Sequence, residues 1–237
     1  SEIARTVASA LAAEMIPDPK VPAGSAGALA AEGGTRSAQA FDAYLRGRAL
    51  YDLSADEASE RAALAQFDAA IAADPDFAPA HAARARSLVA IANQYGKAGQ
   101  LLELHESAIA SARRAIEIAP GLADAYSTLG FTLFQGKLDA RGARAPFERS
   151  RELGAGEATV LARFAQYSAR VGRQQDASAA IQRALLLDKL NPLIHRAAGA
   201  IEYAARNYRA SIPPTRQALQ MNPRMSRAHA AIGDALF

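Results

Sequence analysis

The feature that most constrains the fold is a break in the helical pattern at Asp74-Pro75, which recurs along the chain. Proline disfavours the α conformation in the residue before it, so we expect a helix to end near Asp74. A second Ala-rich helical pattern begins within a few residues, and similar breaks occur at Pro120, Asp188-Lys189 and Asn222-Pro223. The sequence therefore predicts a series of helices joined by short turns.

The breaks are regularly spaced. A separation of about 34 residues, which is a common period of helical repeats, lies between Lys189 and Pro223 and again between Gly199 and Gly233. The spacing from Pro120 to Ala155 and on to Lys189 is nearly the same, whereas Pro75 and Pro120 lie further apart. Such a period, with two helices in it, indicates a helical repeat in which neighbouring units bury a continuous core by stacking.

The composition fits a chain made only of helices. Half of the residues are hydrophobic, but only 6% are aromatic, and many of the apolar residues are Ala, which has the highest helix propensity. The β-branched and aromatic runs of strands are missing. The absence of Cys excludes disulfides, zinc-thiolate sites and a Cys nucleophile. The predicted fold class is all-α.

The pattern resembles the tetratricopeptide repeat (TPR) in the placement of its small and large apolar residues. In the repeat at residues 38–77, the second predicted helix carries Ala63, Phe67 and Ala70 before Pro75. In the repeat at residues 192–225, Gly199 stands late in the first predicted helix. The resemblance implies a right-handed α-solenoid of helix pairs, with about 12 helices in the chain. The predicted array covers residues 38–237, divided into repeats at 38–77, 78–122, 123–157, 158–191 and 192–225 and a partial repeat at 226–237.

The segment before the repeats has a different character. Residues 1–16 form an amphipathic pattern, predicted to be a helix that ends an upstream domain, and residues 17–37 are rich in Pro, Gly, Ala and Ser, as in a linker. This arrangement resembles the TPR region of multidomain bacterial regulators, where the repeats follow a winged-helix or nucleotide-cyclase domain. The resemblance implies a role in signalling or transcription. We expect the chain to be part of a longer protein.

Three kinds of local feature give more detailed expectations. Ser54 and Glu57 have the spacing of a capping box that opens a helix. The second repeat is longer than the others, so its helices should be long and joined near Gly96–Gly99. Pro146 and the pair Pro213-Pro214 lie inside predicted second helices, where we expect a late helix start or a kink.

Candidate catalytic groups are scarce. His81, His195 and His229 occupy the same position in three first helices, where they are interpreted as replacing a core aromatic residue. Equivalent positions of successive repeats are spread along a solenoid, so these residues cannot share a metal ion. No nucleophile and base are paired by spacing, and no phosphate-binding loop follows a strand. We predict no enzymatic activity, no cofactor and no metal site.

The TPR resemblance implies binding in the groove on the concave side, which the first helices line. Arg offers a planar fork for carboxylates, aromatic residues offer buried area, and Gln pairs with a peptide backbone. For Phe131 and Phe134, packing between repeats is an equal alternative to a position in the groove. The predicted partner is a protein or peptide, and an acidic partner is the more specific form of this prediction. The predicted groove residues are Arg86, Ser127, Phe131, Gln135, Gln166, Arg170, Arg196, Tyr203 and Arg227.

The charge distribution leaves alternatives open. Residues 158–237 contain 11 Arg and Lys but 4 Asp and Glu, whereas residues 1–157 contain 16 and 20. Residues 158–237, which carry the excess of basic residues, are interpreted either as a solvated face or as a site for an acidic partner. Nucleic acid is the disfavoured alternative, because the aromatic residues are not interleaved for base stacking. A further alternative is a scaffold that dimerises through residues 226–237, where Ala231, Ile232 and Ala235 should be exposed.

The sequence also gives an expectation about the compartment. No apolar run is long enough to cross a bilayer, so we expect no membrane contact. The predicted compartment is the cytoplasm, with the periplasm as the alternative.

Overall fold

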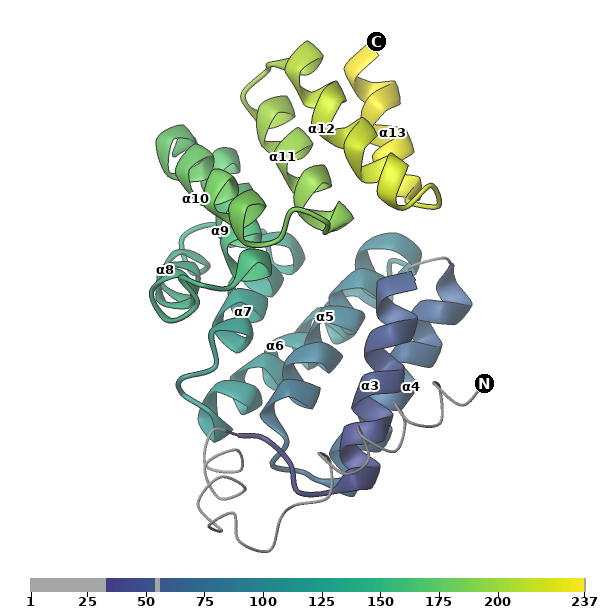
Figure 1. Ribbon diagram of the computed structural model, residues 1–237. Coiled ribbons are helices and arrows are strands. Elements are labelled where there is room, and N and C mark those ends of the chain that lie inside the picture. The colour runs from purple at the N-terminus through teal and green to yellow at the C-terminus, as the bar shows by residue number, and fades with distance from the viewer. Residues whose placement is uncertain (1–32, 54–55, 237) are drawn as a thin grey trace, which may run out of the picture.

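The computed structural model describes residues 33–53 and 56–236, and these residues form helices joined by turns (Figure 1). The predicted N-terminal helix and most of the predicted linker lie outside the described residues. The helices are α3 Ala38–Leu53, α4 Glu57–Ala73, α5 Ala78–Tyr95, α6 Leu101–Ile118, α7 Ala123–Gly136, α8 Arg144–Leu153, α9 Ala158–Arg170, α10 Gln174–Leu187, α11 Pro192–Ala204, α12 Tyr208–Met221 and α13 Ser226–Leu236. The all-α prediction is confirmed.

Consecutive helices pack in pairs, α3 with α4, α5 with α6, α7 with α8, α9 with α10 and α11 with α12. The first helix of a pair also packs against the first helix of the next, which links α5 to α7, α7 to α9 and α9 to α11. The array curves, and Figure 1 shows α11 and α13 returning toward α3 and α5. The structure is the predicted solenoid, with odd-numbered helices on its inner side.

Alanine dominates the interfaces between helices. Ala63, Ala70 and Ala80 have no exposed surface, and the fully buried rings of Phe67 and Phe147 fill the wider spaces between the helices. Small side chains let helix backbones approach closely, while an aromatic ring in a wider gap restores the packing density of a protein core. This combination explains why a chain with few aromatic residues can build a continuous core.

Several boundary predictions are confirmed. Helix α4 ends at Ala73, and Asp74, which precedes Pro75, is its C-cap residue with extended backbone angles. Helices α5 and α6 each have 18 residues, whereas α7 has 14 and α8 has 10, so the surplus of the second repeat lengthens its helices. Pro146 is the third residue of the short helix α8, where its missing N–H costs no helical hydrogen bond, so the expected late start occurs.

One boundary prediction is wrong, and another is wrong in part. Helix α4 has Asp56 as its N-cap, and the Asp56 side chain accepts the backbone N–H of Ser59. The predicted cap residue, Ser54, lies outside the described residues. Helix α12 runs from Tyr208 through Pro213 and Pro214, so the expected late start does not occur, and a kink there stays a prediction. The buried face of α12 against α11 keeps it helical, because tertiary packing outweighs the low helix propensity of proline.

The core interpretation of three histidines is also wrong. His81 and His195 are half-buried and His229 is exposed, so none replaces a core aromatic residue. Each instead bonds the turn before its own helix, through Nε2 and the carbonyl oxygen of the residue six positions earlier. The pairs are His81–Pro75 at 2.9 Å, His195–Lys189 at 2.8 Å and His229–Pro223 at 2.9 Å. The recurring histidine therefore holds each turn against the helix that follows it.

The pH dependence of stability should reflect the buried imidazole of His105 and the half-buried imidazole of His81. Burial lowers the pKa of His81, and burial together with the charge of Lys137 lowers the pKa of His105. The folded state therefore binds fewer protons than the unfolded chain. Stability is fully present above the ordinary histidine pKa of 6.5 and is lost as the pH falls through it toward the lower folded values.

We expect the urea midpoint of unfolding to fall between about pH 7.5 and pH 5.5, and to fall less in His105→Leu, which removes a buried imidazole. An equal fall in both proteins would assign the pH dependence to other groups. The variant His229→Gln, at an exposed position, is the control and should keep the fall of the wild type.

Candidate functional site

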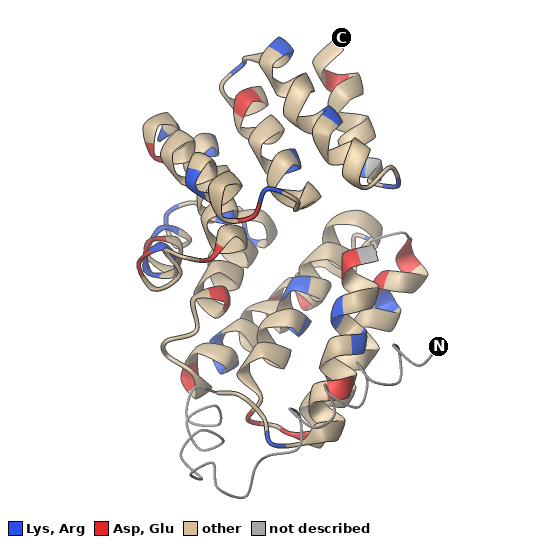
Figure 2. Ribbon diagram, viewed as in Figure 1, with Lys and Arg blue, Asp and Glu red and all other residues tan. Residues whose placement is uncertain are grey.

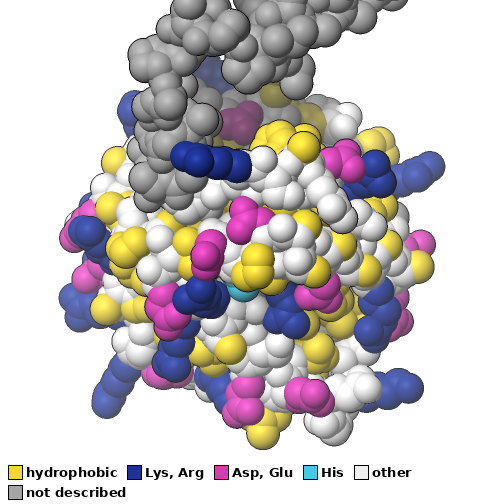
Figure 3. All heavy atoms as spheres, turned by 90° about the horizontal axis from the view of Figure 1, so that it is seen from below, with side chains coloured by type: hydrophobic (Ala, Val, Ile, Leu, Met, Phe, Trp, Pro, Cys, Tyr) yellow, Lys and Arg dark blue, Asp and Glu magenta, His cyan; other side chains and the backbone are white. Residues whose placement is uncertain are grey.

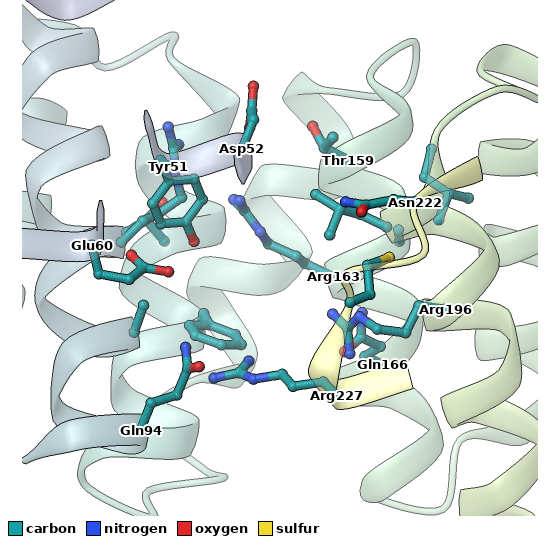
Figure 4. A pocket seen from close by; sticks show the side chains of 18 residues that line it. Tyr51, Asp52, Glu60, Gln94, Thr159, Arg163, Gln166, Arg196, Asn222 and Arg227 are labelled. Carbon is teal, nitrogen blue, oxygen red and sulfur yellow. The ribbon is translucent and has the colours of Figure 1, made fainter. Parts of the chain in front are cut away.

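A cavity of about 170 Å³ lies on the concave side of the solenoid (Figure 4). It has room for on the order of ten water molecules, or for a side chain or two of a bound molecule. Its walls come from helices at both ends of the array, because the curvature brings these ends toward each other. The lining residues are Tyr51, Asp52, Glu60, Arg86, Ala90, Gln94, Thr128, Phe131, Thr159, Ala162, Arg163, Gln166, Leu193, Ile194, Arg196, Asn222, Met225 and Arg227.

Two of the lining arginines share one carboxylate. Asp124 on α7 accepts a hydrogen bond from Arg86 on α5 through Oδ2, and another from Arg163 on α9 through Oδ1 at 2.9 Å. The three side chains are 23%, 13% and 22% exposed, so this network is largely shielded from solvent. Burial alone would raise the pKa of Asp124, but the two arginine charges lower it to about 2. The network joins α5, α7 and α9, the first helices of three successive repeats, and retains one net positive charge.

Arg196 on α11 and Arg227 on α13 differ from this pair. Within the described residues, neither makes a hydrogen bond or an ion pair with a protein group. Arg196 is half-buried, and its pKa falls to about 10 because burial disfavours its charge and Arg227 and Arg170 repel it. A positive charge that is partly desolvated and has no counter-ion favours binding of an anion. Figure 4 shows both side chains extending into the cavity from the same wall.

The opposite wall has acidic and amide groups. Figure 4 places Asp52 and Glu60 on the side of α3 and α4, across the cavity from Arg196 and Arg227. Gln94 on that side and Gln166, which Figure 4 shows beside Arg196, supply amides that can donate to and accept from a peptide backbone. The apolar residues Phe131, Leu193, Ile194 and Met225 complete the lining. The cavity thus combines apolar side chains, amides and separated charges of opposite sign.

The structure brings five of the nine predicted groove residues to this cavity. They are Arg86, Phe131, Gln166, Arg196 and Arg227. Phe131 also packs against the core clusters on either side of it, so it lines the cavity and packs between repeats at the same time. Phe134 is a packing residue, with its ring edge-on to Tyr167 at a centroid distance of 5.2 Å.

The prediction for Ser127 is wrong. Its side chain has no exposed surface, because α5 and α7 pack directly against each other and small residues occupy that interface. Gln135 lies beside Asn93, which donates to it at 3.3 Å, Arg170 is the exposed last residue of α9, and Tyr203 packs edge-on against Tyr208. These three lie outside the cavity lining, and their contact with a partner stays a prediction.

Some lining residues were missed, for identifiable reasons. Arg163 precedes Gln166 by three residues, which places both on one face of α9, so helical spacing could have found it. Asp52 and Glu60 belong to the first repeat, which at residues 38–77 is longer than the period of about 34 residues, so the register of the later repeats does not place them. Asn222 and Met225 belong to the turn before α13, whose approach to the cavity depends on the curvature of the whole array.

Other kinds of site find little support in the part of the chain that the structure describes. No group of three or more His, Asp or Glu there is placed to hold a metal ion. In that same part, no helix is long and apolar enough to cross a membrane. Figure 2 shows acidic and basic residues on helices throughout the array, and Figure 3 shows the two signs interspersed over one end of it, without a broad basic patch.

Comparison with solved structures identifies the class of fold. TTC0263, a thermophilic TPR protein of Thermus thermophilus, has a TM-score of 0.64 and 19% identity over 83% of this chain and 98% of its own. Human IFIT1, solved as a dimer with m7Gppp-AAAA, has a TM-score of 0.64 and 17% identity over 80% of this chain and 44% of its own. The sequence matches no family model and no curated protein. The chain has a TPR-like fold, an α-solenoid of helix pairs.

Proposed function

We propose that this chain is a protein–protein interaction module that holds a segment of a partner protein in the concave cavity. The observation that carries the proposal is the convergence of seven helices on one cavity, with unpaired arginines, amides and apolar groups on its walls. Amides can pair with a peptide backbone, while the apolar lining residues can bury a side chain. A TPR-like solenoid supplies the extended concave surface that such binding needs.

We also propose that the module belongs to a larger bacterial signalling or transcriptional regulator. The support is the resemblance of residues 1–53, a predicted helix and linker followed by the first helix of the array, to the start of the repeat region in such regulators. In that setting, binding in the cavity would report the presence of the partner to an effector domain. The chain itself is proposed to act by binding and not by catalysis.

RNA is the second candidate partner, favoured by the arginines of the cavity and by the RNA-like ligand of the IFIT1 structure. One observation favours protein instead. Asp52 and Glu60 line the same cavity and would repel a chain of phosphates. A scaffold role through α13 also stays a prediction, supported by Leu236, which is 64% exposed, and by the partly exposed Ala231 and Ile232.

A steric block of the cavity tests the proposal. Ala90 lines the cavity on α5, and Ala90→Phe would fill part of it; Ala179→Phe, at an exposed position of α10, is the matched control. We expect selection from a displayed random peptide library to enrich sequences that bind the wild type and Ala179→Phe, and to bind Ala90→Phe at least tenfold more weakly. Equal binding to all three proteins, or no enrichment at all, would reject binding in this cavity.

A further inference from the structure

We infer that the cavity wall formed by Arg196 and Arg227 is the binding site for a doubly negative oxyanion group on the bound protein segment. The group would be either a phosphoryl group or a pair of adjacent carboxylates. This inference rests on the proposed function and adds the chemistry by which the partner is recognised. Its first support is the distribution of charge among the cavity arginines.

The arginines divide into a compensated and an uncompensated pair. Arg86 and Arg163 already bind the two oxygens of Asp124, which fixes their orientation and uses their strongest interaction. Arg196 and Arg227 enter the cavity without a bonded counter-ion among the described residues, although Arg196 is half-buried. A half-buried arginine is stabilised most by an anion that enters the cavity beside it. The free binding capacity therefore lies with Arg196 and Arg227.

The ligand should carry two negative charges. Arg196 and Arg227 extend into the cavity from the same wall (Figure 4), where the charge of Arg227 helps to lower the pKa of Arg196, and one carboxylate would neutralise only one of the two charges. A phosphoryl group carries a charge of about −1.5 to −2 at neutral pH and has three acceptor oxygens, which suit the forked donors of two guanidinium groups. Two adjacent acidic side chains supply the same charge. Gln166 and Asn222 line the cavity too and can donate to the remaining oxygens.

The site favours a localised anion over a polyanion. The cavity holds only about 170 Å³, and the acidic side chains of Asp52 and Glu60 stand on its opposite wall (Figure 4). A chain of phosphates that crossed the cavity would approach these carboxylates, whereas one dianionic group could remain at the arginine wall. A peptide with a single anionic centre fits this arrangement better than a nucleic acid.

A peptide array tests the inference. Each peptide has randomised flanks around a fixed centre of phosphoserine, Glu-Glu or Ser-Gln, and its binding to labelled protein is measured. We expect the wild type to bind the phosphoserine or Glu-Glu set at least tenfold better than the Ser-Gln set. Arg196→Gln combined with Arg227→Gln should abolish this preference. Arg216→Gln, at an exposed position outside the cavity, should keep it.

The variants should remain folded, because removing two arginines that repel each other costs no bonded partner; circular dichroism and the melting temperature check this point. A preference for phosphoserine or for Glu-Glu would support the inference and identify the source of the anion. Equal binding of all three sets, still blocked by Ala90→Phe, would overturn the inference and leave the proposed function standing. Binding of a 5′-triphosphate RNA oligonucleotide in place of every peptide set would overturn both.

Discussion

Asp124→Asn is expected to lower the free energy of unfolding by about 2–4 kcal/mol. The substitution keeps the size of the side chain but leaves Arg86 and Arg163 without their shared counter-ion, in a network that is at most 23% exposed. Breaking a fully buried ion pair costs about 3–5 kcal/mol, and the partial exposure here reduces that cost. The variant should also lose cooperativity between repeats, because α5, α7 and α9 are joined through this carboxylate. Urea denaturation followed by circular dichroism measures the change.

A matched control is Asp176 on α10, which is the second helix of its pair. Asp176 pairs with Arg173 at 2.8 Å, but its side chain is 49% exposed, so Asp176→Asn should change stability by no more than about 0.5 kcal/mol. Adding Arg163→Gln to Asp124→Asn should recover part of the loss, since one of the two stranded charges is removed. A loss in Asp124→Asn no greater than that in the control would show that the network does not hold the inner helices together.

Acid pH gives an independent readout of the same carboxylate. The pKa of Asp124 falls from the ordinary value of 3.8 to about 2 in the folded state, which corresponds to about 2 kcal/mol of stability. Because the folded pKa is lowered, this contribution is present above pH 3.8 and is lost as the pH falls through about 2. Over that interval the wild type should lose more stability than Asp124→Asn, so the two unfolding curves should converge.

The course of the backbone follows from short-range signals in the sequence. Pro75 ends α4 through the conformation it imposes on Asp74, and the extra residues around Gly96 lengthen α5 and α6. Such effects act within one turn of the chain, so they can be read without knowing the partner helices. Pro213 and Pro214 show where this reasoning stops. The packing of α12 against α11 outweighs their local preference, and that packing is a property of the tertiary structure.

The candidate site was accessible to sequence reasoning only in part. Arg86, Gln166 and Arg196 could be found because one register places them all on the inner face of the solenoid. The same register selected Ser127, which the packing of α5 on α7 buries. The sharing of Asp124 by two arginines, and the approach of α13 to the cavity, depend on the curvature summed over all repeats. The spacing of residues in the sequence carries little information about the curvature of the whole array.

The small residue late in each first helix provides the second large effect. Gly130 and Gly199 occupy this position in α7 and α11, and Ala85 and Ala165 are fully buried at the same position in α5 and α9. A Cβ at Gly130 would lie 2.8 Å from the ring of Phe147, and one at Gly199 would lie 2.1 Å from Oγ1 of Thr215. The second helix of each pair therefore approaches most closely where the first carries its smallest residue.

Gly199→Ala should lower the free energy of unfolding by about 1–3 kcal/mol, because the new methyl group also meets the backbone carbonyl oxygen of Ser211 at 2.8 Å, which only a shift of α12 can relieve. Gly233, one repeat later in α13, has the same place in the repeat, but no atom lies within 4 Å of its Cβ position. Gly233→Ala should therefore be neutral or stabilise the protein by up to about 1 kcal/mol through helix propensity alone. Both variants gain the same propensity, so the difference between their unfolding free energies isolates the helix contact. Equal effects would mean that the repeat period at this position does not mark a contact between the helices of a pair.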